Sequence, residues 1–97
     1  MGLPIVRQGD ISTPDPCGAG SRPAIGGSPN VSVNGRPVIR VGDAWAAHAC
    51  PKSAPHTGVQ AAGSSVMTAN GLRVARVGDA ISCGSTAATG SPNASTI

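Results

Sequence analysis

The chain has 97 residues, of which seven are basic and four are acidic, so its formal net charge is +3. It contains one tryptophan, no phenylalanine and no tyrosine, but 14 glycines and 9 prolines. This composition predicts one small domain with a thin core, and it argues against long helices because glycine and proline interrupt them. The basic residues are spread along the chain without aromatic neighbours, so we expect no nucleic-acid partner.

The N-terminal segment, residues 1–8, has neither a basic start nor an apolar run as long as that of a signal peptide. We therefore expect no signal peptide and no export by the general secretory route. The three cysteines are an odd number and lack a Cys-x-x-Cys spacing. A complete disulfide framework is not expected, and metal ligands or free thiols remain as alternatives.

A four-residue phrase that starts with Arg and ends with Gly-Asp occurs at residues 7–10, and it recurs at residues 40–43 and 76–79. The chain is therefore expected to hold three related repeats of roughly thirty residues, each with room for one hairpin and one loop. Glycine permits a bend, and aspartate can accept hydrogen bonds from nearby backbone amides. Each phrase is expected to form a turn or an ion pair with an arginine of a neighbouring repeat. The charged residues of the phrases are Arg7, Asp10, Arg40, Asp43, Arg76 and Asp79.

Two β-hairpins are predicted around the dipeptides Asn34-Gly35 and Asn70-Gly71, because both central positions of a tight hairpin turn favour positive φ. The flanking segments are rich in β-branched residues and partly alternate between apolar and polar. Strands are expected at residues 31–33 and 36–41 in the first hairpin, and at residues 66–69 and 72–77 in the second.

The third hairpin is expected to form from the two ends of the chain. Residues 90–96 repeat the pattern of residues 27–33, but no Asn-Gly turn follows them. The missing second half of this repeat is found at residues 4–8, so residues 93–97 are expected to pair with them. This pairing would close the array into a ring without a free sheet edge. The predicted fold class is all-β, with short β-hairpins and pseudo-three-fold symmetry, in a single domain over residues 1–97 with no effector extension.

The segments that follow the three phrases contain every cysteine and histidine of the chain. If the repeats are related by rotation, these segments converge, and their thiolate and imidazole groups are the ligands that zinc prefers. We expect at least one zinc ligand from each repeat, and one further cysteine is an alternative to one of the four ligands. The alternative is that the cysteines are small buried apolar residues and the histidines are satisfied core groups. The expected ligands are Cys17, His48, His56 and Cys83, with Cys50 as the reserve.

The three phrases, the two Asn-Gly hairpins and the segment at residues 78–85 together resemble the PAAR-repeat proteins, over roughly residues 3–97. The Pro-Ala-Ala-Arg pattern that names this family is represented by residues 37–40 and 73–76. The resemblance implies a compact cone whose point is held by zinc. Family sites have three histidines and one cysteine, so His48, His56 and Cys83 match, whereas Cys17 stands near the place of the missing histidine. Iron is the alternative metal.

The resemblance also implies a function. PAAR-repeat proteins cap the trimeric spike of type VI secretion systems and contractile phage tails, and they help the spike pierce a target cell envelope. The expected partner is a trimeric spike protein, VgrG-like or from a phage tail, with one chain per trimer. The expected location is the spike tip, in the cytoplasm before firing, or the tail tip of a virion.

Two other function classes are alternatives to this structural role. One is a small metal-dependent enzyme, but the chain lacks glutamate, a His-Glu-x-x-His motif and a Gly-x-Ser-x-Gly motif. The other is a secreted binding module, which the odd cysteine count and the absence of a signal segment disfavour. A zinc held by four protein ligands leaves no position for a reactive water. We therefore expect no enzymatic activity.

Overall fold

Short strands and turns form the regular structure of the protein. The computed structural model describes residues 2–14, 20–47 and 57–97. In this part of the chain there is no helix, and so none that is long and apolar enough to cross a membrane. The six strands are β1 (Leu3–Pro4), β2 (Ser32–Val33), β3 (Arg36–Pro37), β4 (Thr68–Ala69), β5 (Leu72–Arg73) and β6 (Ser95–Thr96).

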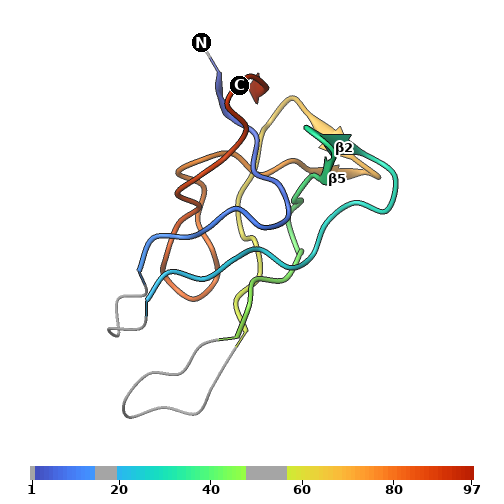
Figure 1. The fold of residues 1–97 in the computed structure, drawn as a ribbon. Helices are drawn as coiled ribbons and strands as arrows, with labels where there is room; N and C mark the ends of the chain where they lie inside the picture. The colour runs from blue at the N-terminus through green and yellow to red at the C-terminus, as the bar shows by residue number, and fades with distance from the viewer. Residues whose placement is uncertain (1, 15–19, 48–56) are drawn as a thin grey trace.

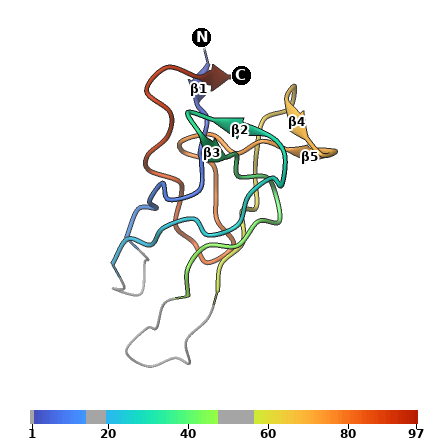
Figure 2. The same cartoon turned by 45° about the vertical axis from the view of Figure 1, so that its right-hand side comes forward.

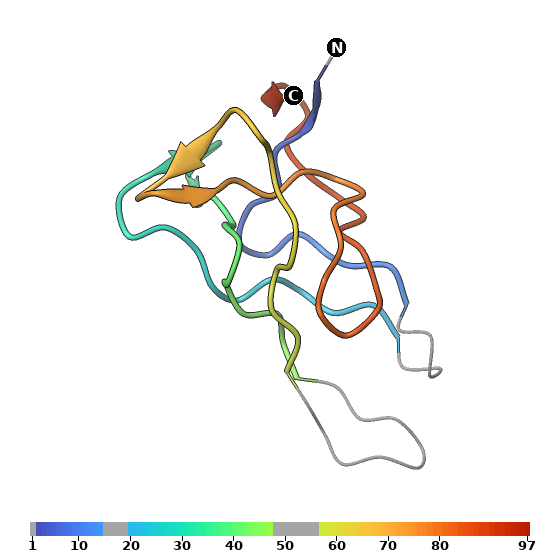
Figure 3. The ribbon, with the colours of Figure 1, turned by 180° about the vertical axis from the view of Figure 1, so that it is seen from behind.

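The strands pair into three antiparallel two-stranded sheets, β1–β6, β2–β3 and β4–β5. β1 pairs with β6 through Leu3 opposite Thr96 and Pro4 opposite Ser95, which confirms that the two ends of the chain make the third hairpin. All three pairs lie at one end of the molecule, and both termini lie beside β1 and β6 (Figures 1 and 2). The view from behind shows the β4–β5 hairpin (gold) and the termini at this same end (Figure 3). We call this end the hairpin end.

The two internal hairpins turn at the predicted dipeptides. φ is 56° at Asn34 and 76° at Gly35, and it is 55° at Asn70 and 80° at Gly71. Positive φ at both central residues is the geometry that matches the twist of the flanking strands. Asparagine tolerates this region better than most residues, so the local sequence is sufficient to explain both turns.

Backbone pairing also joins the repeats to one another. Isolated β-bridges connect Ile5 with Arg76, Arg7 with Val38, and Arg40 with Val74. Each repeat is therefore paired with both of the others, which confirms the predicted closure of the array. The rotation that would relate the repeats exactly in space, and the conical outline, stay predictions.

The core has two clusters, and each takes equivalent residues from all three repeats. One lies next to the hairpins and contains Ile5, Val38 and Val74, with Ala69. The other contains Trp45, which is 2% exposed, among mostly small aliphatic residues. The thin core predicted from composition is thus divided into layers that the repeats share. The second cluster comprises Val6, Ala24, Ile39, Trp45, Ala75, Ile81 and Ala87.

Candidate functional site

Each Gly-Asp phrase forms a turn that an ion pair closes. In the first copy, the backbone N–H of Asp10 donates to the carbonyl of Arg7 at 2.9 Å, and Gly9 has φ +90°, as the third residue of a type II turn requires. The Asp10 carboxylate accepts the backbone N–H of Arg7 at 2.8 Å, its Nε–H at 3.0 Å and its Nη2–H at 3.1 Å. The turn is therefore held by backbone and by a bidentate ion pair together.

The second and third phrases repeat this arrangement. Arg40 Nη2 lies 2.9 Å from Asp43 Oδ1, and Arg76 Nη2 lies 2.9 Å from Asp79 Oδ1. The predicted turn role is confirmed in all three copies. The predicted alternative, an ion pair with a neighbouring repeat, is wrong for these arginines, since each pairs with the aspartate three residues ahead. One longer contact does cross between repeats, from Arg36 Nη1 to Asp10 Oδ1 at 3.9 Å.

The first ion pair is the most deeply buried of the three, with Arg7 and Asp10 each 5% exposed. The hydrogen bond to Asp10 raises the pKa of Arg7, and the charge of Asp10 adds to this, against the opposing effect of burial. Burial alone would raise the pKa of Asp10, but the hydrogen bonds from Arg7 and Thr89 and the charge of Arg7 lower it below its usual value. Both groups are thus held in their charged forms.

The asparagine of the first turn is bound by side chains of another repeat. Asn34 Oδ1 accepts hydrogen bonds from Arg7 Nη1 at 3.1 Å and from Ser91 Oγ at 2.6 Å. Asn34 Nδ2 donates to Asn93 Oδ1 at 2.9 Å. We call these three hydrogen bonds to one turn asparagine a turn latch. The latch links the β2–β3 hairpin to the repeat that contains both chain ends.

The second turn has the same latch with equivalent residues. Asn70 Oδ1 accepts from Arg40 Nη1 at 3.0 Å and from Ser28 Oγ at 2.6 Å, and Asn70 Nδ2 donates to Asn30 Oδ1 at 2.7 Å. The serine also caps a tight turn of its own repeat, because Ser28 Oγ accepts the backbone N–H of Val31 at 2.9 Å. Each latch therefore ties a hairpin tip to a buried serine and to a guanidinium already fixed by its aspartate.

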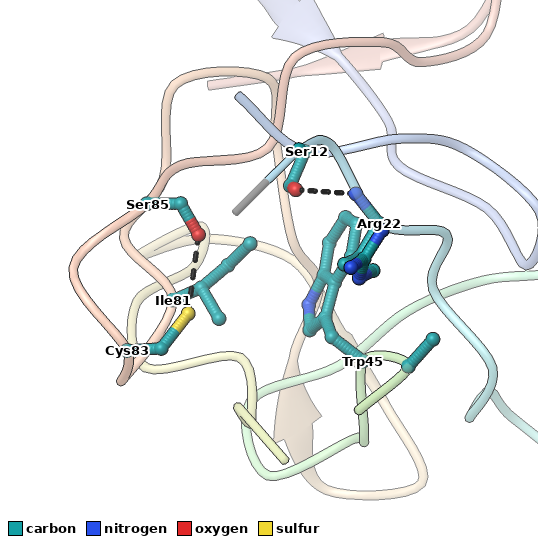
Figure 4. A pocket seen from close by; sticks show the side chains of 8 residues that line it. Ser12, Arg22, Trp45, Ile81, Cys83 and Ser85 are labelled. Atoms are coloured by element: carbon teal, nitrogen blue, oxygen red, sulfur yellow. Dashed lines mark hydrogen bonds between the residues drawn. The ribbon is translucent and has the colours of Figure 1, made fainter. Parts of the chain in front are cut away.

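A small pocket lies on the side of the core away from the hairpins, between Trp45 and Cys83 (Figure 4). The half-buried thiol of Cys83 points toward Ser85, with Sγ 3.1 Å from Oγ. Across the pocket, the indole of Trp45 donates from Nε1 to Gln60 Oε1 at 3.0 Å. The pocket is lined by Ser12, Gly20, Arg22, Trp45, Ala46, Ile81, Cys83 and Ser85.

Cys83 is the one predicted metal ligand that lies within the described residues; Cys17, His48, His56 and the reserve Cys50 lie outside them. Within residues 2–14, 20–47 and 57–97, no three His, Cys, Asp or Glu side chains gather into a group that could hold a metal ion. The surroundings of Cys83 nevertheless suit a ligand. A Cβ at Gly58 would lie 3.1 Å from Cys83 Sγ and 2.9 Å from an Ile81 methyl carbon, so only glycine leaves the thiol its space.

The sequence positions around this pocket are informative. Gly20 follows Cys17 by three residues, Ala46 precedes His48 by two, and both line the pocket with Cys83. Gly58, two residues after His56, lies against Cys83, since a Cβ added to it would come within 3.1 Å of Sγ. Described neighbours of the predicted ligands therefore border the pocket that Cys83 lines or lie against Cys83. The donor set of thiolates and imidazoles fits zinc.

From the sequence, the latch arginines are identified only as members of the Gly-Asp phrases and Asn34 and Asn70 only as turn formers, and the serine and asparagine partners of the latches are not identified. A signal for their partners exists, since a Gly-Ser dipeptide recurs at residues 27–28, 63–64 and 90–91. All three of these serines are buried. Recurrence of a polar residue at a fixed place in each repeat would have indicated a shared hydrogen-bonding role.

A family model described as PAAR motif matches residues 23–89, which is more than half of the chain. No curated protein matches the chain significantly.

Proposed function

Because the chain belongs to the PAAR-motif family, a family of structural spike-tip proteins, we propose that it caps the central spike of a contractile injection machine. The observation that carries this proposal is the closed arrangement of three paired repeats, with one hairpin from each at the same end. A single chain built in this way offers three similar surfaces. A spike of three identical subunits offers three equivalent partners, so one chain per trimer is the expected stoichiometry.

The hydrogen-bonded framework supports a mechanical role. The three turns, the three ion pairs and the two latches fix the backbone at positions where a thin core supplies little packing. Buried charged groups with complete partners are costly to separate, because each would be left unpaired in a poorly hydrated site. A tip with this construction resists local opening under load. We propose that it acts on the target envelope by piercing it, and not by catalysis.

We further propose that zinc, with iron as the alternative, is bound by Cys83 together with Cys17, His48 and His56, and that Cys50 is the reserve ligand. When bound, the metal would cross-link segments of all three repeats on the side away from the hairpins. Structural zinc contributes on the order of 10 kcal/mol to the folding of zinc-finger peptides. The role of Gly58 would be to let the Cys83 thiol face the metal.

The spike tip gives the expected location, either in a bacterial type VI secretion system, where the chain waits in the cytoplasm before firing, or in the tail of a phage. Docking tests this. The full chain is mixed with candidate recombinant spike trimers, and mass is measured by light scattering during size-exclusion chromatography. We expect one chain per trimer. A complex of three chains per trimer, or no complex with any contractile spike, would overturn the proposal.

Matched variants make the docking test specific to the hairpin end. Ser32→Trp and Thr68→Trp put a bulky group on exposed positions of two hairpins and are expected to abolish the complex. Ala88→Trp is exposed outside the hairpins and is expected to bind as the original chain does. If Ala88→Trp alone blocks the complex, the docking surface lies elsewhere.

Metal content is tested separately by elemental analysis of dialysed protein. We expect about one zinc per chain, the stoichiometry of one closed four-ligand site. Cys83→Ser is expected to lose the metal and to melt at a much lower temperature, whereas Cys50→Ser keeps both. Full metal content in Cys83→Ser would show that the ligand assignment is wrong.

A further inference from the structure

The two internal turns carry a sequence that is chemically labile. In an Asn-Gly dipeptide, the glycine nitrogen attacks Cγ of the asparagine, the Cγ–Nδ2 bond breaks and ammonia leaves. Water then opens the succinimide ring to aspartate or isoaspartate. Glycine favours this reaction because it has no side chain in the path of ring closure. Asn34-Gly35 and Asn70-Gly71 are both exposed to water, so their sequence and exposure alone would mark them as sites of deamidation.

The latches act on the atoms that this reaction must move. Ring closure makes Cγ tetrahedral, which shifts Oδ1 and Nδ2 out of the plane of the carboxamide. In Asn34 that plane is fixed by Arg7 and Ser91 at Oδ1 and by Asn93 at Nδ2. Arginine can only donate, so the oxygen must face it and the amide cannot reverse.

The two serine donors are themselves immobile. Ser91 is 3% exposed and accepts the backbone N–H of Ala94 at 2.9 Å, while Ser28 is 4% exposed and accepts that of Val31 at 2.9 Å. If a carboxamide moves toward the glycine nitrogen, the serine hydroxyl can stay hydrogen-bonded to it only by losing its own hydrogen bond from the backbone N–H of Ala94 or Val31. A latch therefore restrains its asparagine from the side of another repeat.

We propose that Asn34 and Asn70 are latent deamidation sites that the turn latches protect in the folded chain. Each asparagine is protected by a serine that is distant in the sequence. Ser91 restrains Asn34 from 57 residues away, and Ser28 restrains Asn70 from 42 residues away. Deamidation at either turn removes the Nδ2 donor and with it one of the three hydrogen bonds of the latch. The inference does not depend on docking or on metal.

Three serine variants of the full chain test the proposal. Each is incubated at neutral pH, and deamidation at each asparagine is measured by peptide mapping with mass spectrometry. Ser91→Ala is expected to speed the reaction at Asn34 on the order of fivefold to tenfold, the factor that the loss of one hydrogen bond supplies. Ser28→Ala is expected to act in the same way on Asn70 alone. Ser64→Ala removes the equivalent serine of the repeat that contains β4 and β5. Among the described residues this serine contacts no turn asparagine, so its removal should change neither rate.

Exposed variants keep the test usable if a buried serine proves necessary for folding. Asn93→Ala removes the acceptor of Asn34 Nδ2, and Asn30→Ala removes that of Asn70 Nδ2. Each is expected to raise the rate at its own partner only, and urea-unfolded chain should show equal, faster rates at both sites. Equal acceleration at both asparagines in every variant would reflect global unfolding and overturn the proposal. Unchanged rates in Ser91→Ala and Asn93→Ala would overturn it too.

Discussion

The two hairpins that turn at Asn-Gly and the hairpin made from the chain ends occupy equivalent places but are held differently. Ile97 follows β6 as Asn34 follows β2, and Gly2 precedes β1 as Gly35 precedes β3. The tip of the hairpin made by the chain ends thus has a glycine, Gly2, but no asparagine carboxamide. Strand pairing forms there without a turn, as the β1–β6 register shows. Strand pairing and the turn latch therefore stabilise a hairpin separately, and the hairpin made by the chain ends has strand pairing without a latch.

The arginines of the three Gly-Asp phrases also differ in their hydrogen bonds to the hairpin tips. Arg7 and Arg40 each donate from Nη1 to a turn asparagine, whereas in the described part of the chain Arg76 uses its Nε and Nη2 on Asp79 and gives Nη1 to no other residue. Ser64 donates to the carbonyl oxygen of Ile97 in place of a side chain. This backbone oxygen accepts the hydrogen bond from Ser64, but it has no amide group that could donate, as Nδ2 of Asn34 and Asn70 does. We call the contact of each hairpin tip with the arginine and serine of the adjacent repeat a junction, and we call the junctions of Arg7 with Asn34 and of Arg40 with Asn70 complete because each has a latch. Among the described residues, the junction at the chain ends has the fewest hydrogen bonds between repeats.

The largest effect should come from removing the arginine of a complete junction. Arg7→Ala removes the main partner of the buried Asp10, which among the described residues keeps only Thr89 at 3.0 Å and the longer contact with Arg36 at 3.9 Å, and it also breaks a latch. We therefore expect a loss of about 3 kcal/mol in the free energy of unfolding. Arg76→Ala should cost less, because its side chain is 21% exposed and belongs to no latch. Urea unfolding followed by the fluorescence of Trp45, the single tryptophan, measures both. Equal losses would mean that the junctions do not differ.

Serine substitutions sharpen the comparison at the latch itself. Ser91→Ala and Ser64→Ala both remove the cap of a tight turn, so that loss is common to the two. Ser91→Ala also withdraws a donor from a turn asparagine, whereas Ser64→Ala withdraws one from the backbone oxygen of Ile97. Ile97 is exposed, so water can replace the serine there, and we expect Ser91→Ala to cost more, by up to about 1 kcal/mol, the net contribution of one hydrogen bond. The difference is read from urea midpoints at equal metal content. A greater loss in Ser64→Ala would contradict this ranking.

Acid should weaken the first junction through Asp10. Its pKa is lower in the folded chain than in the unfolded one, so the unfolded chain binds more protons as pH falls, and stability is lost in that direction. The contribution is complete above the unfolded value of about 4 and disappears as pH falls through the folded value. The stability gap between the original chain and Asp10→Asn should therefore be present at neutral pH and shrink below about pH 4. A gap independent of pH would indicate that Asp10 acts only by its shape.

The smallest effect is a gain. Ile97→Asn places a carboxamide at the position that corresponds to Asn34 and Asn70, next to Ser64, which already donates to the backbone oxygen of Ile97. Ile97 is 65% exposed, so its removal leaves no cavity, and we expect a gain of about 0.5–1.5 kcal/mol for the completed hydrogen bonds. Ile97→Ser, which is polar but has no carboxamide, is the control. No difference between the two variants would show that the third junction cannot accept a latch.

Much of the fold follows from local sequence. The Asn-Gly turns, the Gly-Asp turns and the pairing of the chain ends were all predictable, because each depends on backbone preferences within a few residues or on the repeat pattern. For the aspartates of the Gly-Asp phrases, the sequence leaves two roles open, a turn or an ion pair with a neighbouring repeat, and the structure shows the turn, closed by the arginine of the same phrase. Spacing alone does not tell whether an arginine pairs within its own turn or across to the next repeat.

Of the candidate metal site, the sequence proposed the donors, and the structure adds the setting of Cys83 against Gly58, where a thiol fits only because a Cβ is missing. The pairing of Trp45 with Gln60 is likewise a tertiary result, since nothing in either residue's local sequence selects the other. Turn geometry is a property of a few adjacent dihedral angles, so the sequence by itself determined where the chain bends. Which side chains latch the two Asn-Gly turns was decided by tertiary structure, because a latch needs donors and acceptors from segments 42 or 57 residues apart in the chain to arrive at the same carboxamide.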